Sequence, residues 1–148
     1  MSGNQEMQQL SQELQALEEE QEALEGEVEM LHEEKQSVDE AIDAVGSLDT
    51  GTTVQVPLGG GASVRATIED IDEIIVELGG GYAVEQPEGD AVETLESRKD
   101  TIDDRISDVQ SEIAEVETEL EELEQRARQL QQQQMQQQMQ QLQQQDDE

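Results

Sequence analysis

The apolar residues between Met7 and Val45 recur every three or four positions, and no other feature constrains the fold as strongly. They are Met7, Leu10, Leu14, Leu17, Leu24, Val28, Leu31, Val38, Ile42 and Val45, with Gln21 and Lys35 in the two gaps. More than five heptads in unbroken phase predict a coiled-coil helix, because a helix on a globular surface has a wider stripe that drifts in phase. Such a helix needs a partner with a matching stripe.

A second stripe with the same spacing lies in the second half of the chain. It consists of Val92, Leu95, Ile102, Ile106, Val109, Ile113, Val116, Leu120, Leu123, Ala127 and Leu130, with Lys99 in its one gap. If the two helices fold back as an antiparallel hairpin, the residue numbers of every facing pair sum to 137, from Val45 with Val92 to Met7 with Leu130. Two stripes of equal length also suit a parallel dimer, so that alternative stays open.

Lys35 and Lys99 occupy stripe positions, where the hairpin would place them among apolar residues. A long lysine stem can cover such a seam while its ammonium group reaches a flanking Glu or Asp. Polar residues at these positions fix the register of a coiled coil at some cost in stability. We therefore expect both lysines to reach acidic residues beside the seam.

The stretch between the stripes contains an internal repeat. The segment VPLGGGASV at 56–64 recurs as VELGGGYAV at 76–84. Apolar and polar residues alternate on both sides of each glycine triplet, which predicts two β-hairpins that turn at Gly59–Gly61 and Gly79–Gly81. Glycine permits the positive φ angles of tight turns. Pro57 removes a ladder donor, so its strand is expected at a sheet edge or at a bulge.

Two other interpretations of this stretch are disfavoured. The triplets suggest phosphate-binding loops, but no Lys-Ser or Lys-Thr pair follows them and no helix begins there. Asp70 and Asp72 suggest a calcium loop, but Ile71 and Ile74 interrupt the pattern, and the glycine and distal glutamate of an EF-hand are missing. We expect these aspartates to be surface residues of the connector between the hairpins.

The predicted hairpins need other chains, because an isolated hairpin is marginal in water and the sequence has a single aromatic residue, Tyr82. The same insert from other chains would cover their edges and apolar faces by closing sheets or barrels. The expected fold is therefore α+β: a long antiparallel helical coiled coil with two inserted β-hairpins that assemble into an oligomeric β-barrel body. The expected oligomerisation residues are Val54, Val56, Leu58, Val64, Ile68, Ile74, Val76, Leu78, Tyr82 and Val84.

The charge of the chain argues against two classes of partner. Seven basic residues against 39 acidic ones give a net charge of −32. Such a chain repels the phosphates of nucleic acid and the surface of an anionic membrane. The same charge destabilises a compact state by self-repulsion unless salt screens it, which favours the salt-rich cytosol of a halophile.

No residue pattern indicates catalysis or a bound cofactor or metal. The sequence contains no cysteine, so disulfides and thiolate metal sites are excluded. Its one histidine, His32, falls beside the seam next to glutamates, and its serines and threonines have no base at a recognisable spacing. The N-terminus lacks signal-peptide features, and no apolar run is long enough for a membrane span. We therefore expect a cytoplasmic protein that is not an enzyme.

These patterns divide the chain into four parts: an N-terminal coiled-coil helix at 1–47, a double β-hairpin at 48–88, a C-terminal coiled-coil helix at 89–130 and a Gln-rich helical tail at 131–148. Asp90-Ala91-Val92-Glu93 resembles a capping box with Asp90 at the cap. Thirteen of the seventeen residues from 129 to 145 are glutamine, and Met135, Met139 and Leu142 lie at i, i+4 and i+7. The tail is either a low-complexity end that frays or a flexible face for unspecific apolar contacts.

The order of elements and the two glycine-triplet segments, VQVPLGGGASVRATI and IIVELGGGYAVEQP, resemble archaeal prefoldin over nearly the whole chain. Two hairpins instead of one point to the α-type subunit. The resemblance implies a hexamer of two α-type and four β-type subunits, in which the hairpins form a double β-barrel body that carries six coiled coils. The acidic surface and the long Gln-rich tail go beyond the usual pattern of this family.

The resemblance also implies a function. The chain would be part of an ATP-independent chaperone, a holdase that captures unfolded polypeptides at the coiled-coil tips and passes them to a group II chaperonin. Several weak tip contacts on one platform add through effective concentration. The candidate client-binding residues are Met7, Leu10, Leu130, Met135, Met139 and Leu142. The alternative is a structural coiled-coil scaffold or tether that binds no client.

Overall fold

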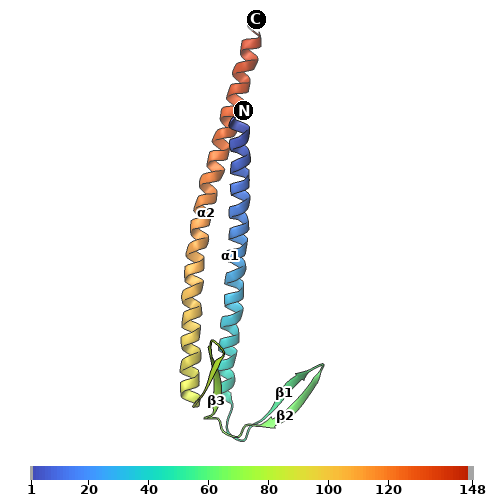
Figure 1. Cartoon of the computed structure of the whole chain (residues 1–148), viewed down its shortest axis with the longest axis vertical. Coiled ribbons are helices and arrows are strands. Elements are labelled where there is room, and N and C mark those ends of the chain that lie inside the picture. The colour runs from blue at the N-terminus through green and yellow to red at the C-terminus, as the bar shows by residue number, and fades with distance from the viewer. Residues whose placement is uncertain (1, 147–148) are drawn as a thin grey trace. The chain divides into compact units, whose positions relative to one another are not determined.

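The computed structural model describes residues 2–146, which form two long helices with four strands between them (Figure 1). The elements are α1 (Ser2–Ser47), β1 (Thr53–Gly59), β2 (Ala62–Thr67), β3 (Ile74–Gly79), β4 (Tyr82–Gln86) and α2 (Glu88–Asp146). The strands make two separate antiparallel hairpins, β1–β2 and β3–β4. The predicted α+β order of helix, two hairpins and helix is confirmed.

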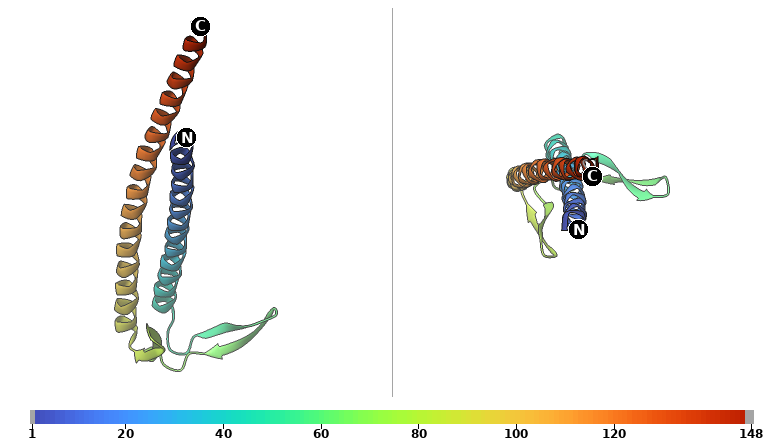
Figure 2. Two further views of the ribbon diagram at one scale, coloured as in Figure 1. Left: turned by 45° about the horizontal axis from the view of Figure 1, so that its top comes forward. Right: turned by 90° about the horizontal axis from the view of Figure 1, so that it is seen from above.

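The chain divides into two compact units. The first combines Met1–Met30 with Ile106–Glu148, and the second is Leu31–Arg105. Within each unit, segments of α1 and α2 lie side by side (Figures 1 and 2). The contacts between these segments show the direction and register of the helices separately in each unit.

In the second unit, two ion pairs join α1 to α2. Lys35 Nζ lies 2.7 Å from Asp103 Oδ1, and Lys99 Nζ lies 2.7 Å from Asp39 Oδ1. Each lysine reaches the acidic residue that follows its facing seam residue, as the heptad positions predict. Val38, which lies between the two pairs in the seam, is buried. Because these contacts join two helices of one chain, the antiparallel hairpin is confirmed over the parallel dimer.

In the first unit, the same register holds. Gln21 Nε2 donates a hydrogen bond of 3.3 Å to Glu117 Oε1, and Val109 and Val116 are buried in the seam. The last layer lies one step beyond Met7 and Leu130: the side-chain nitrogen of Gln134 is 2.9 Å from the point where a Cβ on Gly3 would stand. Only glycine leaves room there for the glutamine in its present position.

Both hairpins turn at their glycine triplets, as predicted. Val56 pairs with Val64 in the first hairpin, and Val76 pairs with Val84 in the second. In each, the register shifts by one residue just before the triplet, and all six triplet glycines have φ between 61° and 96°. Residues with a Cβ rarely adopt such angles, so the turns need glycine. Pro57 adjoins the register shift of the first hairpin, in agreement with the predicted bulge.

The connector between the hairpins is a turn built on Asp70. Its Oδ1 accepts a hydrogen bond of 3.0 Å from the backbone N–H of Asp72, and its carbonyl accepts one of 3.2 Å from Glu73. Asp commonly makes such bonds to its own backbone in turns. The side chain of Asp70 therefore has a local structural role.

The predicted cap of the second long helix was wrong. α2 begins at Glu88, and the backbone N–H of Ala91 donates a hydrogen bond of 2.9 Å to the carbonyl of Pro87. Asp90 therefore lies inside the first turn. Its carboxylate still stabilises the helix there, because the first turn carries the positive end of the helix dipole.

Candidate functional site

The second helix continues beyond the contact between Gly3 and Gln134. α2 extends past the Gly3–Gln134 layer to Asp146, and this extension presents Met135, Met139 and Leu142 on one face. We call these three residues the tail stripe. Their side chains are 66%, 67% and 63% exposed. Among residues 2–146, this helix face is therefore an apolar surface that the rest of the chain leaves exposed.

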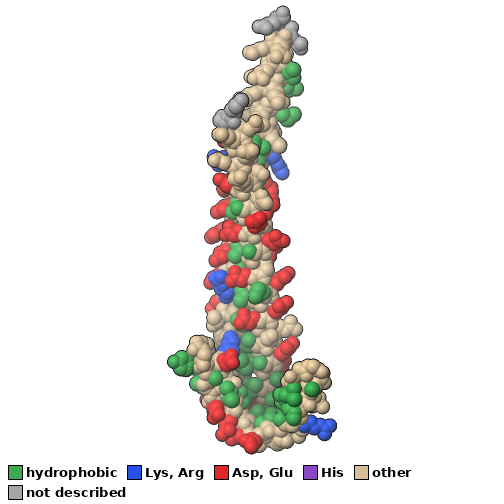
Figure 3. All heavy atoms as spheres, turned by 45° about the vertical axis from the view of Figure 1, so that its right-hand side comes forward, with side chains coloured by type: hydrophobic (Ala, Val, Ile, Leu, Met, Phe, Trp, Pro, Cys, Tyr) green, Lys and Arg blue, Asp and Glu red, His purple; other side chains and the backbone are tan. Residues whose placement is uncertain are grey.

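The tail stripe lies in the longest uncharged stretch of the helices. Residues 129–145 contain no Asp, Glu, Lys or Arg, in a chain with 39 acidic residues. Figure 3 shows acidic side chains crowded along the paired helices and absent from the Gln-rich end of α2 on that face. An acidic polypeptide therefore meets less electrostatic repulsion at this end than along the acidic segments of the helices.

The other predicted client-binding residues lie in the seam of the first unit. Leu10 is only 7% exposed, and Met7 and Leu130 are half-buried. A partner could reach Leu10 only if the end layers of the hairpin opened. The six candidates therefore form two groups, three seam residues and the three exposed residues of the tail stripe.

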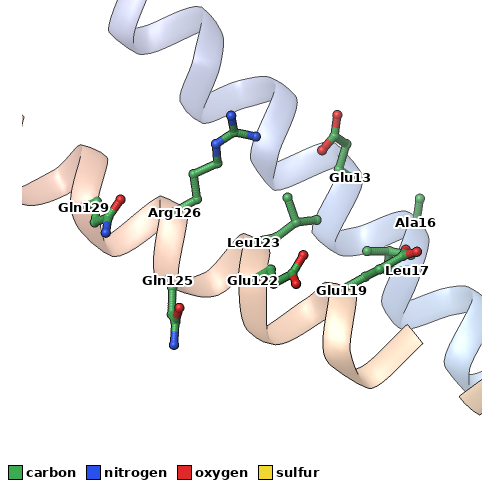
Figure 4. A pocket seen from close by; sticks show the side chains of 9 residues that line it. All are labelled: Glu13, Ala16, Leu17, Glu119, Glu122, Leu123, Gln125, Arg126 and Gln129. Atoms are coloured by element: carbon green, nitrogen blue, oxygen red, sulfur yellow. The ribbon is translucent and has the colours of Figure 1, made fainter. Parts of the chain in front are cut away.

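An open groove of about 670 Å³ lies between α1 and α2 in the first unit. It is lined by Glu13, Ala16, Leu17, Glu119, Glu122, Leu123, Gln125, Arg126 and Gln129. Leu123 and Arg126 extend from α2 toward α1, whereas Gln125 points away (Figure 4). Leu17 and Leu123 are seam residues, so the apolar floor is the furrow between two packed helices. This groove needs no ligand to explain it.

A second exposed apolar surface lies on the first hairpin. Val56 and Val64 share one face of β1–β2 and are exposed, as is Leu58 at the register shift beside them. Val54 on the same face and Ile68 just beyond β2 are half-buried. The opposite face carries Thr53, Gln55, Pro57, Ser63, Arg65 and Thr67, and is therefore polar apart from Pro57. This division into an apolar and a polar face is typical of a sheet that packs its apolar side against another protein surface.

The second hairpin is attached to the start of α2. Arg98 donates a hydrogen bond from Nη2 to the carbonyl of Glu77, and Thr94 Oγ1 donates one of 3.0 Å to Gln86 Oε1. Val76 is buried. Ile74 and Val84 are half-buried, whereas Leu78 and Tyr82 are exposed near the turn. Part of this predicted oligomerisation set is therefore covered within the chain itself.

The alternating pattern did not predict Ile75 as a surface residue, yet Ile75 is 69% exposed on the opposite face of β3. The run Ile74-Ile75-Val76 carried the signal, because consecutive apolar residues indicate a strand that is covered on both faces. Met30 was also missed: it is 70% exposed on α1, outside the seam.

The described residues offer no arrangement for metal chemistry. Within residues 2–146, no group of three or more His, Cys, Asp or Glu is placed to hold a metal ion. His32 is exposed on α1. Over the same residues, neither helix contains a segment long and apolar enough to cross a membrane.

Comparisons with a family model and with curated proteins both match this chain to prefoldin subunits. The family model described as "Prefoldin subunit" matches residues 10–145. Prefoldin subunit alpha of Halorubrum lacusprofundi is 61% identical over 98 residues, which are 66% of this chain and 64% of that protein. The same-named protein of Haloarcula marismortui is 62% identical over 64 residues, 43% of this chain and 42% of that protein. The chain thus spans less than two thirds of each relative's length.

The fold also has a solved counterpart. A chain of filamentous PFD from Methanocaldococcus jannaschii, determined by cryo-EM, superposes with a TM-score of 0.68. The match covers 74% of this chain and 93% of that chain, at 24% sequence identity. At this identity the likeness shows a shared fold.

Proposed function

This chain belongs to the prefoldin family, and from that premise we propose that it is a subunit of an ATP-independent chaperone that binds unfolded polypeptides. The observation that carries the proposal is the tail stripe: an exposed apolar face on a helix that has outrun its partner, in a stretch without charge. An unfolded polypeptide exposes apolar segments of varied shape. Methionine suits such partners because its unbranched side chain adapts to irregular surfaces.

Each tail stripe is small, so one copy binds weakly. Three side chains cover far less surface than a stable protein interface requires. Several tails on one oligomer would raise the affinity, because each contact after the first becomes intramolecular. The proposed function therefore depends on assembly.

We propose that residues 48–88 provide this assembly. The exposed apolar face of β1–β2 and the exposed Ile75 need cover, and hairpins of other subunits would supply it. The family suggests β-type subunits as partners, in a hexamer of two α-type and four β-type chains. We further propose a cytoplasmic location and transfer of the bound polypeptide to a group II chaperonin. In this division, residues 1–47 and 89–130 form the coiled coil, and residues 131–148 make the outermost client contact.

The test replaces the three apolar residues of the tail stripe with polar residues that add no charge to the helix. Met135→Gln, Met139→Gln and Leu142→Gln are combined in one variant, because glutamine matches the neighbouring residues and favours helix. Met30→Gln is the matched control, since Met30 is equally exposed but lies outside the tail. Each variant is assembled with β-type subunits, and light scattering follows the aggregation of a chemically unfolded client without nucleotide.

We expect wild type and Met30→Gln to suppress aggregation and the triple variant to lose most of this effect. Equal suppression by the triple variant would show that the tail stripe does not bind the client. A wild-type assembly that leaves aggregation unchanged would support the alternative, a structural scaffold without client binding.

A further inference from the structure

Two of the three residues in the tail stripe contain sulfur. Met135 and Met139 lie one helical turn apart and are 66% and 67% exposed, so solvent reaches both thioethers. Leu142 occupies the same face with similar exposure, which shows that the stripe does not need sulfur in order to be apolar. The methionines therefore add a chemical property, because an exposed thioether is readily oxidised.

The oxidation step is balanced with a hydroperoxide as the oxidant. The sulfur lone pair attacks the O–O bond, and a sulfur–oxygen bond forms as the O–O bond breaks. When the oxidant is hydrogen peroxide, the departing OH group takes up the proton that the transferred oxygen loses and leaves as water. The sulfur loses two electrons and the peroxide gains them. The product, methionine sulfoxide, is polar and is reduced back by methionine sulfoxide reductases.

We propose that Met135 and Met139 form a reversible oxidation switch on the tail stripe. Peroxide converts both residues to sulfoxides, and the face that binds unfolded polypeptide becomes polar apart from Leu142. The subunit then holds its clients less tightly until the sulfoxides are reduced. This inference rests on the proposed function, because it concerns the regulation of the same surface.

Met30 shows whether oxidation of any exposed methionine weakens client binding, because it lies outside the tail stripe. Met30 is 70% exposed, so peroxide reaches it as easily as it reaches the tail. It lies on α1 outside the seam, in a stretch with Glu27, Glu29, Glu33 and Glu34 nearby in sequence, and contributes to no apolar face. Oxidation of Met30 should therefore leave client binding unchanged, whereas oxidation of the tail pair should weaken it.

The experiment compares three proteins, each assembled with β-type subunits: wild type, Met30→Leu, and the double variant Met135→Leu with Met139→Leu. Leucine keeps the stripe apolar and helical but removes its sulfur. Each assembly is treated with hydrogen peroxide, which catalase removes before the client is added. Peptide mass spectrometry locates the added oxygen, about 16 Da for each sulfoxide. Light scattering then measures client aggregation before treatment, after treatment and after incubation with both sulfoxide reductases.

We expect peroxide to raise the amount of wild-type assembly needed to halve aggregation by roughly fivefold, with recovery after reduction. Met30→Leu should respond like wild type, and the double leucine variant should stay active throughout. If wild type kept full activity with Met135 and Met139 oxidised, the switch would be overturned but the proposed function would stand. The same holds if peroxide inactivated the double leucine variant as strongly as wild type. Untreated wild type that fails to suppress aggregation would overturn the proposed function and the switch with it.

Discussion

At the scale of single residues, Lys99 shows how a charged side chain fits an otherwise apolar seam. The hydrogen bond from its Nζ to Asp39, together with the negative charge of that carboxylate, raises the pKa of Lys99 above its ordinary value of 10.5. A raised pKa means that the folded chain binds this proton more tightly than the unfolded chain does. The stabilising contribution is therefore complete below pH 10.5 and is lost as the pH rises through the raised pKa.

The substitution Lys99→Met tests this linkage. We expect the free energy of unfolding of wild type to fall relative to that of Lys99→Met as the pH rises above 10.5, because only wild type loses the bound proton at this site. Urea unfolding followed by circular dichroism, at pH values below and above 10.5, measures the difference. Glu33→Gln is the control, since it changes an exposed residue and should differ from wild type by a constant amount. A constant difference for Lys99→Met would contradict the prediction.

The outcomes at single residues show what sequence patterns can resolve. The acidic partners of both lysines could be predicted in kind, because the heptad phase places the acceptors beside the seam. The cap of α2 could not, since Pro87 and Asp90 both suit a helix start and the preference between such starts is only about 1 kcal/mol. Ile75 was missed because the alternation rule assigns one face of a strand to solvent, and this strand follows the rule only in part.

At the scale of the helices, the two lysines select one register. Each native ion pair joins residues whose numbers sum to 138. A slip by one heptad would replace Asp39, the ion-pair partner of Lys99, with His32 in one direction and with Gly46 in the other. The native register is therefore the one of these three in which both Lys35 and Lys99 meet an aspartate.

A charge exchange tests the contribution of the ion pair between Lys35 and Asp103. Lys35→Glu and Asp103→Lys should each lower the free energy of unfolding, because each places two like charges together, and the double variant should recover most of the loss. The pair is partly exposed, so the coupling is expected at about 0.2–1 kcal/mol. Denaturant titration of the four proteins gives this coupling energy. Glu33→Lys, a charge reversal at an exposed position outside the seam, should show no coupling to Asp103→Lys. A coupling as large as that between Lys35→Glu and Asp103→Lys would contradict the assignment.

The hairpins carry a second prediction at this scale. Val56→Asp places a carboxylate on the exposed apolar face of β1–β2 and should prevent association with β-type subunits, while the helix content stays unchanged. Gln55→Asp is the matched control, because it puts the same residue one position away on the polar face. Sedimentation velocity of each chain mixed with its partner measures assembly. Equal assembly of the two variants would show that the apolar face is not the joint.

The two hairpins also mark a limit of repeat-based prediction. Their glycine triplets, registers and bulges agree, as the duplicated sequence predicts. Their surroundings differ: Thr94 and Arg98 of α2 bind the second hairpin, whereas Val56, Leu58 and Val64 of the first hairpin are exposed. Those contacts come from α2, outside the repeat, so the repeat carried no signal for them.

At the scale of the whole molecule, one part of the predicted architecture lies beyond a single chain. The described residues hold two separate two-stranded sheets, and a closed barrel would need strands from other subunits. The sequence could still predict the need for partners, because the exposed apolar residues Val56, Leu58 and Val64 were recognisable by their alternation. The geometry of the closed assembly depends on residues of the other chains and stays a prediction.

The net charge of −32 determines a property of the whole chain, its dependence on salt. Exposed acidic residues follow one another along both helices, and like charges three or four positions apart destabilise a helix by about 0.2–0.5 kcal/mol for each pair. Salt shortens the range of this repulsion from about 30 Å at 0.01 M to about 3 Å at 1 M. The folded chain should therefore be much less stable in dilute buffer than in concentrated KCl, as the halophilic sources of its relatives suggest.

We expect the midpoint of thermal unfolding, measured by circular dichroism, to rise steeply with KCl at low concentration and more slowly once the charges are screened. A variant with Glu22→Gln, Glu29→Gln and Glu33→Gln removes three exposed charges from α1 outside the seam. Its midpoint should exceed that of wild type in dilute buffer and approach it in concentrated KCl, because screening and neutralisation remove the same repulsion. Sucrose separates this cause from a general strengthening of apolar burial, since it favours burial without screening charge. An equal rise in sucrose, or an unchanged salt response in the variant, would refute repulsion between the acidic residues as the cause.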